Sequence, residues 1–351
     1  MIDADTTPES SFPQPPLGPL KLRASLHETI WGGRRLATLA GKTLPPDALI
    51  GESWETANDA VVETPPFARH TLAELVLRYG PALIGTRAVE IYGRRFPLLT
   101  KFIDAQQWLS VQVHPEDDYA AAHEGGKLGK TETWYILHAE PGAQIVYGFT
   151  RAVTRDEVRQ AIAATQLEAL LNTVEVHAGD VVFVPAGTVH AIGAGVALYE
   201  LQEYSDVTYR LYDYGRLQAN GQPRELHVDR ALDVLRTEPP TTVQLTPRLI
   251  KSLGANGTQR TLVACPYFVE EELRLDGEAQ LAVTGASCQI LTLLEGACEV
   301  AGSVGEPITL AHGDTAVLPA TLGAATLRSQ PGASARLIRS YVPTADDPAL
   351  A

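Results

Sequence analysis

The sequence feature that most constrains the fold is an alternation of polar and apolar side chains over residues 108–114, within the run WLSVQVHPEDD. If these residues form a strand, its twofold side-chain period gives the strand one polar face and one apolar face. The polar face then carries Ser110, Gln112 and His114, and the apolar face carries Leu109, Val111 and Val113. Such a strand needs a sheet that packs on one side and gathers polar groups on the other.

A second short strand is expected close behind, in the run GKTETWYIL at residues 129–137. Its period places Glu132, Trp134 and Ile136 on a shared face. Glu132 can then meet Gln112 and His114 inside a sheet or barrel. This is the beginning of a metal site.

The remaining pattern is mostly that of short strands separated by turns. The runs at 174–193 and 195–216 are typical of an antiparallel barrel or sandwich. Phe96–Ala105 is expected to be a buried strand, and its Lys101 needs a partner or a ligand. Two capping boxes indicate short helices. One is at Thr71 and Glu74, and the other is at Thr154 and Glu157, before a segment without Gly or Pro that reaches Asn172. The run at 227–236 indicates a third short helix. The fold class is therefore mainly β.

The length and composition indicate two domains. The chain has 351 residues, of which 45% are hydrophobic. Residues 1–19 are rich in Pro, Ser and acidic residues, which predicts a flexible arm. A change of composition near residues 238–246 predicts a boundary between a unit at 20–238 and a unit at 239–351.

Charge and cysteine content exclude several classes of protein. The formal net charge of −14 argues against nucleic-acid binding, because that binding depends on neutralising phosphates. The N-terminus has neither a basic region nor an apolar core, and no apolar run reaches membrane-spanning length. The three cysteines are odd in number and lack a CxxC pair, so neither a disulfide framework nor a zinc ribbon is indicated. We expect a soluble, cytoplasmic protein that does not associate with membranes.

An internal repeat joins HAGDVVFVPAGTVHAIG to AHGDTAVLPATLGAATL. Gly179-Asp180 corresponds to Gly313-Asp314, and Val184-Pro185-Ala186 to Leu318-Pro319-Ala320. His190 then corresponds to Ala324. We therefore expect the second half to be a structural copy without a metal.

The first copy fits the pattern G-x5-P-x-G-x2-H, which resembles the second motif of the cupin superfamily. Gln112-x-His114 followed by Glu132 resembles the first cupin motif, with Gln in place of the usual leading His and a longer gap before Glu. The resemblance implies two cupin, jelly-roll-like β-barrel domains. Two imidazoles and two oxygen donors suit a divalent first-row metal and leave coordination positions open. The alternative is that His114 and His190 are core or turn histidines, but their joint spacing favours ligands.

Several separated motifs together resemble the type I mannose-6-phosphate isomerases. These motifs are IWGG, GESWE, VQVHPEDDYA, KTETWYIL, VPAGTVHAIG and EYSDVTYRLYDYGR. The resemblance implies one zinc ion per chain, held by Gln112, His114, Glu132 and His190, and a sugar-phosphate substrate. It also implies an active-site role for Arg210, polar active-site roles for Ser110, Lys130 and Glu200, and a phosphate-site role for Lys101. It makes residues 20–238 the catalytic metal-binding domain, with helical insertions, and residues 239–351 a degenerate cupin-like domain.

The implied reaction interconverts mannose 6-phosphate and fructose 6-phosphate through an enediol, which requires a base and stabilisation of negative charge. We expect a hairpin that directs Glu200 and Arg210 into the barrel, with Glu200 as the base. Lys130 either assists proton transfer or is a solvated surface residue. Two other functions stay open: an Fe(II)-dependent cupin oxygenase and a non-catalytic bicupin that binds sugar phosphates. The oligomeric state also stays open.

Overall fold

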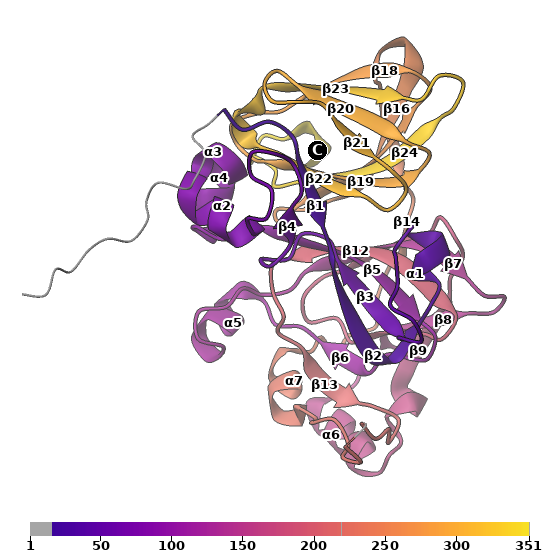
Figure 1. The fold of residues 1–351 in the computed structure, drawn as a ribbon. Coiled ribbons are helices and arrows are strands. Elements are labelled where there is room, and N and C mark those ends of the chain that lie inside the picture. Colours follow the sequence, from indigo (N-terminus) through magenta and orange to yellow (C-terminus); the bar gives the residue numbers. More distant parts are fainter. Residues whose placement is uncertain (1–15, 219, 351) are drawn as a thin grey trace, which may run out of the picture.

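A computed structural model describes residues 16–218 and 220–350. The fold is mainly β, and the strand pairs of the described residues are antiparallel (Figure 1). In this part of the chain, no helix has the length and apolar character needed to cross a membrane.

The N-terminal half is a sandwich of two sheets. Apolar side chains from both sheets, among them Ile103, Trp134 and Leu198 from the larger sheet and Ile145 and Ile192 from the smaller, form the core between them. The larger sheet has the order β14 (Gln244–Leu245), β10 (Val181–Val184), β7 (Glu132–Ala139), β12 (Val196–Glu203), β5 (Leu98–Ala105), β3 (Ile50–Trp54) and β2 (Ser25–Gly33). The smaller has the order β13 (Tyr209–Tyr212), β6 (Val111–Val113), β11 (His190–Ile192), β8 (Gln144–Phe149) and β9 (Leu171–Glu175).

The C-terminal half is a second sandwich with its own core, which includes Leu273, Leu291, Val300 and Leu327. Its larger sheet has the order β15 (Arg248–Ser252), β16 (Gly257–Ala264), β17 (Val269–Leu275), β24 (Ala335–Tyr341), β19 (Gln289–Glu295), β22 (Thr315–Leu318), β1 (Leu20–Arg23) and β4 (Val61–Val62). Its smaller sheet has the order β18 (Glu278–Ala282), β23 (Ala324–Ser329), β20 (Cys298–Gly302) and β21 (Ile308–Leu310).

The two halves repeat one strand order. The series β10-β7-β12-β5-β3-β2 matches β22-β19-β24-β17-β16-β15, and β6-β11-β8-β9 matches β18-β23-β20-β21. The turn of the sequence repeat has the same hydrogen bonds in both copies: Asp180 Oδ2 accepts from His177 N and Asp314 Oδ2 accepts from Ala311 N, each at 2.7 Å. Gly179 and Gly313, at φ 96° and 82°, occupy a backbone region that favours glycine. The repeat expected from the sequence is confirmed in the backbone.

Each half also receives at least one strand from the other part of the chain. β14 follows the expected boundary at residue 238 but pairs with β10 of the N-terminal half. β1 lies at the start of the expected catalytic unit but pairs with β22 of the C-terminal half. The division at 238/239 stays a prediction, and three strands, β1, β4 and β14, cross it.

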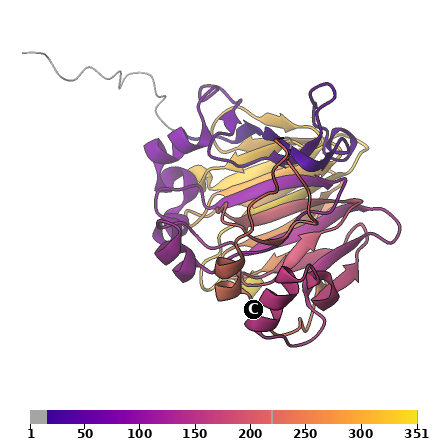
Figure 2. The ribbon, with the colours of Figure 1, turned by 90° about the horizontal axis from the view of Figure 1, so that it is seen from below.

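The two larger sheets pack face to face in the middle of the molecule, as Figures 1 and 2 show. Their shared core contains Phe102, Tyr199 and Leu201 from one half and Phe268 and Ile338 from the other. Alternate residues of β5, β7 and β12 therefore face either this junction or the interior of the N-terminal sandwich. This alternation aims a set of polar side chains at the smaller N-terminal sheet.

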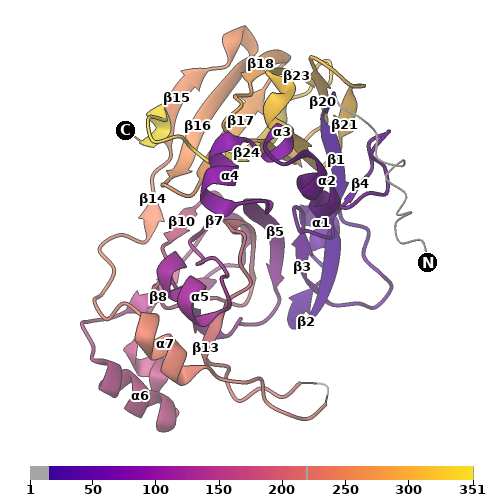
Figure 3. The ribbon, with the colours of Figure 1, turned by 90° about the vertical axis from the view of Figure 1, so that its left-hand side faces the viewer.

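Short helices cover the edges of the sandwiches. Figure 3 shows α2 (Leu72–Tyr79), α3 (Pro81–Ile84) and α4 (Thr86–Tyr92) beside the junction of the halves, where Cys288 N donates to Ile84 O at 3.0 Å. The capping box at Thr71 and Glu74 is confirmed at the start of α2. The other elements are α1 (Leu36–Leu39), α5 (Asp117–His123), α6 (Arg155–Ala163), α7 (Val228–Val234) and the 3-10 turns η1 (Leu167–Leu170), η2 (Gly254–Asn256), η3 (Ala320–Leu322) and η4 (Pro348–Leu350).

The helix after Thr154 was predicted to reach Asn172, and this is wrong. Thr154 does cap it by accepting from Glu157 N, but α6 ends at Ala163 and Thr165 has a positive φ of 58°. Residues 171–175 then form β9, which pairs with β8. Sheet pairing outweighs local helix propensity in this segment.

Three other expectations need correction or restriction. In the described residues the four sheets are open, so the expected closed barrels are not found. The hairpin expected for Glu200 and Arg210 is wrong, because β12 and β13 lie in different sheets. Residues 1–15 of the expected flexible arm lie outside the described residues, whereas Leu17 is buried in the shared core.

The shared core predicts that the two halves unfold together. All four tryptophans, at positions 31, 54, 108 and 134, lie in the N-terminal half, whereas Phe268 lies in the C-terminal half, fully buried, with its ring 6.4 Å from that of Phe183. Phe268→Ala should lower the free energy of unfolding by about 3–5 kcal/mol. Urea unfolding followed by tryptophan fluorescence should register this loss.

The matched control is Leu77→Ala, because Leu77 is 63% exposed on α2 and its truncation should change stability by less than about 0.5 kcal/mol. An unchanged tryptophan transition in Phe268→Ala would show that the halves unfold independently.

Candidate metal centre

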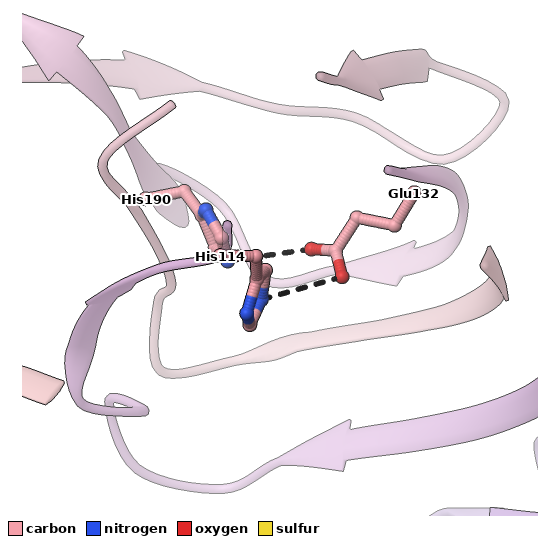
Figure 4. A group of neighbouring side chains, drawn as sticks. All are labelled: His114, Glu132 and His190. Atoms are coloured by element: carbon pink, nitrogen blue, oxygen red, sulfur yellow. Dashed lines mark ion pairs between the residues drawn. The ribbon is translucent and has the colours of Figure 1, made fainter. Parts of the chain in front are cut away.

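Three potential metal ligands from separate strands converge inside the N-terminal sandwich. His114 follows β6, Glu132 begins β7 and His190 begins β11, and their ligand atoms all lie within 4.8 Å of one another. Figure 4 shows the carboxylate of Glu132 facing both imidazoles. His190 Nε2 lies 3.3 Å from Glu132 Oε1, and His114 Nε2 lies 3.6 Å from Glu132 Oε2. The three side chains are almost fully buried.

Backbone carbonyls orient both histidines. Nδ1 of His114 lies 2.8 Å from Val207 O, and Nδ1 of His190 lies 2.8 Å from Thr188 O. A proton on each Nδ1 satisfies these carbonyls and leaves the lone pair of Nε2 directed at the site. Burial, reinforced by Lys130, lowers the pKa of His190 to about 4 and that of His114 well below its ordinary value. Both imidazoles are therefore neutral at pH 7, as metal ligands must be.

The environment of Glu132 fits a cation. Its Oε1 is buried and, among the described residues, accepts no hydrogen bond. Burial and the neighbouring charge of Glu200 raise the pKa of Glu132 to about 7, although the ammonium of Lys130, in contact with Oε2, acts to lower it. Lys130 Nζ also lies 3.2 Å from His114 Nε2. Two imidazole nitrogens and a carboxylate without thiolates are donors that suit zinc and other divalent first-row metals.

Gln112 lies beside this group. It pairs with His190 across β6 and β11, and its Nε2 is 3.4 Å from His190 Nε2. Rotation of the amide by 180° exchanges its oxygen and nitrogen, so the side chain is placed to offer an oxygen ligand. The structure thus brings together all four residues that the motifs indicated.

A chain of alternating charges continues from the His114–Glu132–His190 group along the larger sheet. Lys101 Nζ lies 3.4 Å from Glu200 Oε1 and 3.7 Å from Glu52 Oε2, and Trp134 Nε1 donates to Glu200 Oε2 at 3.1 Å. Burial acts to raise the pKa of Glu200, but Lys130 and Lys101 outweigh it and the pKa is lowered. Burial acts to lower the pKa of Lys101, but Glu52 and Glu200 outweigh it and the pKa is raised. Glu200 is therefore a carboxylate and Lys101 an ammonium at neutral pH.

Arg210 approaches from the smaller sheet. Its Nε donates to Ser110 Oγ at 3.2 Å, and its NH1 donates to Glu225 O at 2.9 Å. Burial and the nearby Arg224 lower its pKa from a very high ordinary value, so it stays cationic. The facing sheets, rather than a hairpin, bring Arg210 and Glu200 to one cavity.

The cavity has a volume of about 360 Å³. Ser110, Gln112, Lys130 and Glu200 line it together with Lys101 and Arg210. The lining cations are Lys101, Lys130, Arg210 and Arg224, and the lining carboxylates are Glu52, Glu200 and Asp206. The lining thus has one more cation than carboxylates, in a chain whose net charge is −14. This offsets the repulsion that such a chain presents to an anionic substrate.

Sequence reasoning did not single out Glu52, Trp54 or Arg224. Glu52 and Trp54 alternate along β3 beside Lys101, whose ammonium lies 4.6 Å from the centre of a Trp54 ring. Alternation within GESWE was the available signal, but it fits ordinary sheet packing equally well. Arg224 lies in a loop, where it is held by Asp213, and no periodic pattern marks it.

Comparison with known proteins identifies the family. Residues 20–169 match the family model of the phosphomannose isomerase type I catalytic domain. The mannose-6-phosphate isomerase of Streptococcus mutans is 38% identical over 308 residues, covering 87% of this chain and 93% of that protein. Mannose-6-phosphate isomerase ManA of Bacillus subtilis is 41% identical over 268 residues, covering 75% and 81%.

A solved structure agrees with this identification. The crystal structure of the mannose 6-phosphate isomerase from Bacillus subtilis matches with a TM-score of 0.82 and 33% identity, covering 92% of this chain and 99% of that chain. The family resemblance indicated by the motifs is confirmed. The chain therefore belongs to the type I mannose-6-phosphate isomerases, a family of isomerase enzymes.

Proposed function

We propose that this chain is a zinc-dependent aldose–ketose isomerase that interconverts mannose 6-phosphate and fructose 6-phosphate through an enediolate. The observation that carries the proposal is the buried His114–Glu132–His190 group at the cavity that Lys101, Lys130, Arg210 and Glu200 line. Family membership supports the choice of substrate. It also disfavours the oxygenase and the non-catalytic binding protein.

In the proposed site His114, Glu132, His190 and Gln112 hold one zinc ion per chain. Zinc, when bound, supplies Lewis-acid polarisation of the substrate oxygens. Three observations support the ligand set. The ligand atoms of His114, Glu132 and His190 converge, and Oε1 of Glu132 is buried without a hydrogen-bond partner among the described residues. The backbone carbonyls bind Nδ1 of each histidine, so the lone pair of Nε2 is available to a metal.

We assign the proton transfer to Glu200, because Lys101 and Lys130 keep it ionised next to the cavity. Starting from the open-chain aldose, its carboxylate removes the proton from C2, the C–H electron pair forms the C1–C2 double bond, and the carbonyl electron pair moves onto O1 to give the enediolate. O1 then takes up the proton that O2 loses, the C2 carbonyl forms, and the electron pair of the C1–C2 double bond takes the proton back from Glu200 at C1. Arg210 stabilises the negative charge of the intermediate with a permanently cationic guanidinium. Lys130, in contact with Glu132 and 3.9 Å from Glu200, assists the exchange of hydroxyl protons.

We propose Ser110 and Lys101 as substrate contacts. Ser110 accepts from Arg210 and lines the cavity, so its hydroxyl is held next to the reacting carbons. Lys101 offers positive charge to the phosphorylated substrate, and its contacts with Glu200 also orient the proposed base.

For the architecture we propose two cupin-like units, a catalytic one at 20–238 and a C-terminal one at 239–351 without a metal. Their common strand order supports a shared ancestry. We also propose a cytoplasmic location, supported by three buried free thiols, Cys265, Cys288 and Cys298.

The zinc site predicts that His190→Ala lowers both metal content and turnover. Loss of this imidazole removes one of the four proposed ligands, so we expect zinc well below one ion per chain and turnover reduced by at least about a hundredfold. Elemental analysis and a coupled assay on mannose 6-phosphate measure the two effects.

The control for this variant is His312→Ala, because His312 lies in the C-terminal half and contacts Leu39 O. Wild-type protein stripped by a chelator should lose turnover and regain it with zinc. Full turnover in the metal-free protein would contradict the zinc assignment.

The base assignment predicts that Glu200→Gln lowers kcat by about 10²–10⁴-fold, because an amide of the same shape cannot accept the C2 proton. Zinc content should stay at one per chain, since Glu200 is not among the proposed ligands. Exchange of the C2 proton of the substrate with deuterium from solvent should slow in parallel. Near-normal turnover would eliminate Glu200 as the base.

The substrate contact predicts that Lys101→Met raises KM for mannose 6-phosphate and lowers kcat, because positive charge is lost and Glu200 loses an orienting partner. Arg95→Met is a matched control, since Arg95 is exposed and is not among the residues that line the cavity. If steady-state kinetics showed both constants unchanged in Lys101→Met, the role of Lys101 would be discarded.

A further inference from the structure

The C-terminal half has a second cavity, of about 300 Å³, between the sheets of its sandwich. It is lined by polar side chains that include Gln259, Glu271, Gln289, Arg339 and Tyr341. Ligand sites in proteins have volumes from roughly 300 Å³ upward, so the space suits a small molecule.

Sheet register places this cavity at the position that corresponds to the metal centre. Glu132 pairs with Val184 in the first half, and Gln289 pairs with Leu318, the repeat partner of Val184, in the second. Gln112 pairs with His190, whereas Ala282 pairs with Ala324. The second cavity therefore keeps the place of the first, but a glutamine and two alanines replace three of the proposed ligands.

The charged pair beside the metal centre recurs with its charges exchanged. Lys101 and Glu200 are cross-strand neighbours 3.4 Å apart, and Glu271 and Arg339 are cross-strand neighbours 3.3 Å apart at the corresponding register. Gln259 Nε2 donates to Glu271 Oε1 at 2.7 Å, and Arg339 lies 4.7 Å from the centre of the Tyr341 ring. The second cavity is thus lined on one side by polar side chains that contact one another.

Two buried polar atoms of that lining have no hydrogen-bond partner among the described residues. They are Oε1 of Gln289, an acceptor, and Nε of Arg339, a donor. Gln289 is held in place by its Nε2, which donates to Ala282 O at 2.8 Å. A group that both donates and accepts would satisfy both atoms, and a hydroxyl does this.

The charge of the cavity argues against an anion. Arg339 is balanced by Glu271, and Asp347, next to η4, adds a second lining carboxylate. We propose that this cavity is a binding site for a neutral polyhydroxy compound, an unphosphorylated sugar or polyol. The site lies apart from the proposed catalytic cavity and needs no metal.

The test is a calorimetric titration of the zinc-loaded, full-length protein with D-mannose, D-glucitol and myo-inositol, each with and without saturating mannose 6-phosphate. At least one of these probes should bind with 1:1 stoichiometry and should not be displaced by the sugar phosphate. Thr284→Trp, at an exposed lining position, should fill the cavity and weaken binding at least tenfold. Gln289→Leu should weaken it similarly by removing the acceptor.

The matched control is Leu77→Trp, which adds the same side chain on α2 and should leave binding unchanged. Isomerase turnover should be unchanged in Thr284→Trp. If Gln289→Leu does not fold, Thr284→Trp alone decides. The proposal is overturned if no probe binds more tightly than about 10 mM, if binding survives in Thr284→Trp, or if mannose 6-phosphate displaces the probe. If the isomerase assignment were wrong, the titration would still test this site, because loss of binding in the cavity variants locates the probe in the C-terminal cavity.

Discussion

The chemistry of this protein depends on a buried carboxylate that needs positive charge. Glu132 lies between two sheets, where an uncompensated charge costs several kcal/mol, and its Oε1 has no hydrogen-bond donor among the described residues. Two neutral imidazoles and an ammonium surround it. The group therefore suits a cation, and the neighbouring Lys101–Glu200 pair extends the same polar layer into the adjoining cavity.

The surrounding fold supports this polar layer from the opposite face of the same sheet. Alternate residues of β5, β7 and β12 enter the shared apolar core, so the larger N-terminal sheet is held by Phe102, Tyr199 and Leu201 on one face while the other face carries charge. The exchange of β1 and β14 between the halves strengthens this junction. The face that packs in the shared core and the face that carries the charged side chains are thus two sides of the same strands.

The duplicated strand order shows how one framework supports two kinds of interior. At corresponding positions the first half has Glu132, Gln112 and His190, and the second has Gln289, Ala282 and Ala324. The backbone hydrogen bonds do not depend on these side chains, so the polar layer can change while the sheets stay the same. This explains why the repeated turn at Asp180 and Asp314 is retained where Gln112, Glu132 and His190 are replaced.

The resemblance to two cupin motifs indicated Gln112, His114, Glu132 and His190 as candidate ligands, and the sequence by itself determined which side chains of a strand share a face. That is local information, because the twofold period of a strand is set within a few residues. The tertiary structure decided which strands meet. β12 and β13 lie in different sheets that both contribute to the cavity, and residues 171–175 form β9, which pairs with β8. Glu52 and Arg224 reach the cavity from a distant strand and a loop. Pairing between distant segments depends on the burial of whole sheet faces, which no local pattern encodes.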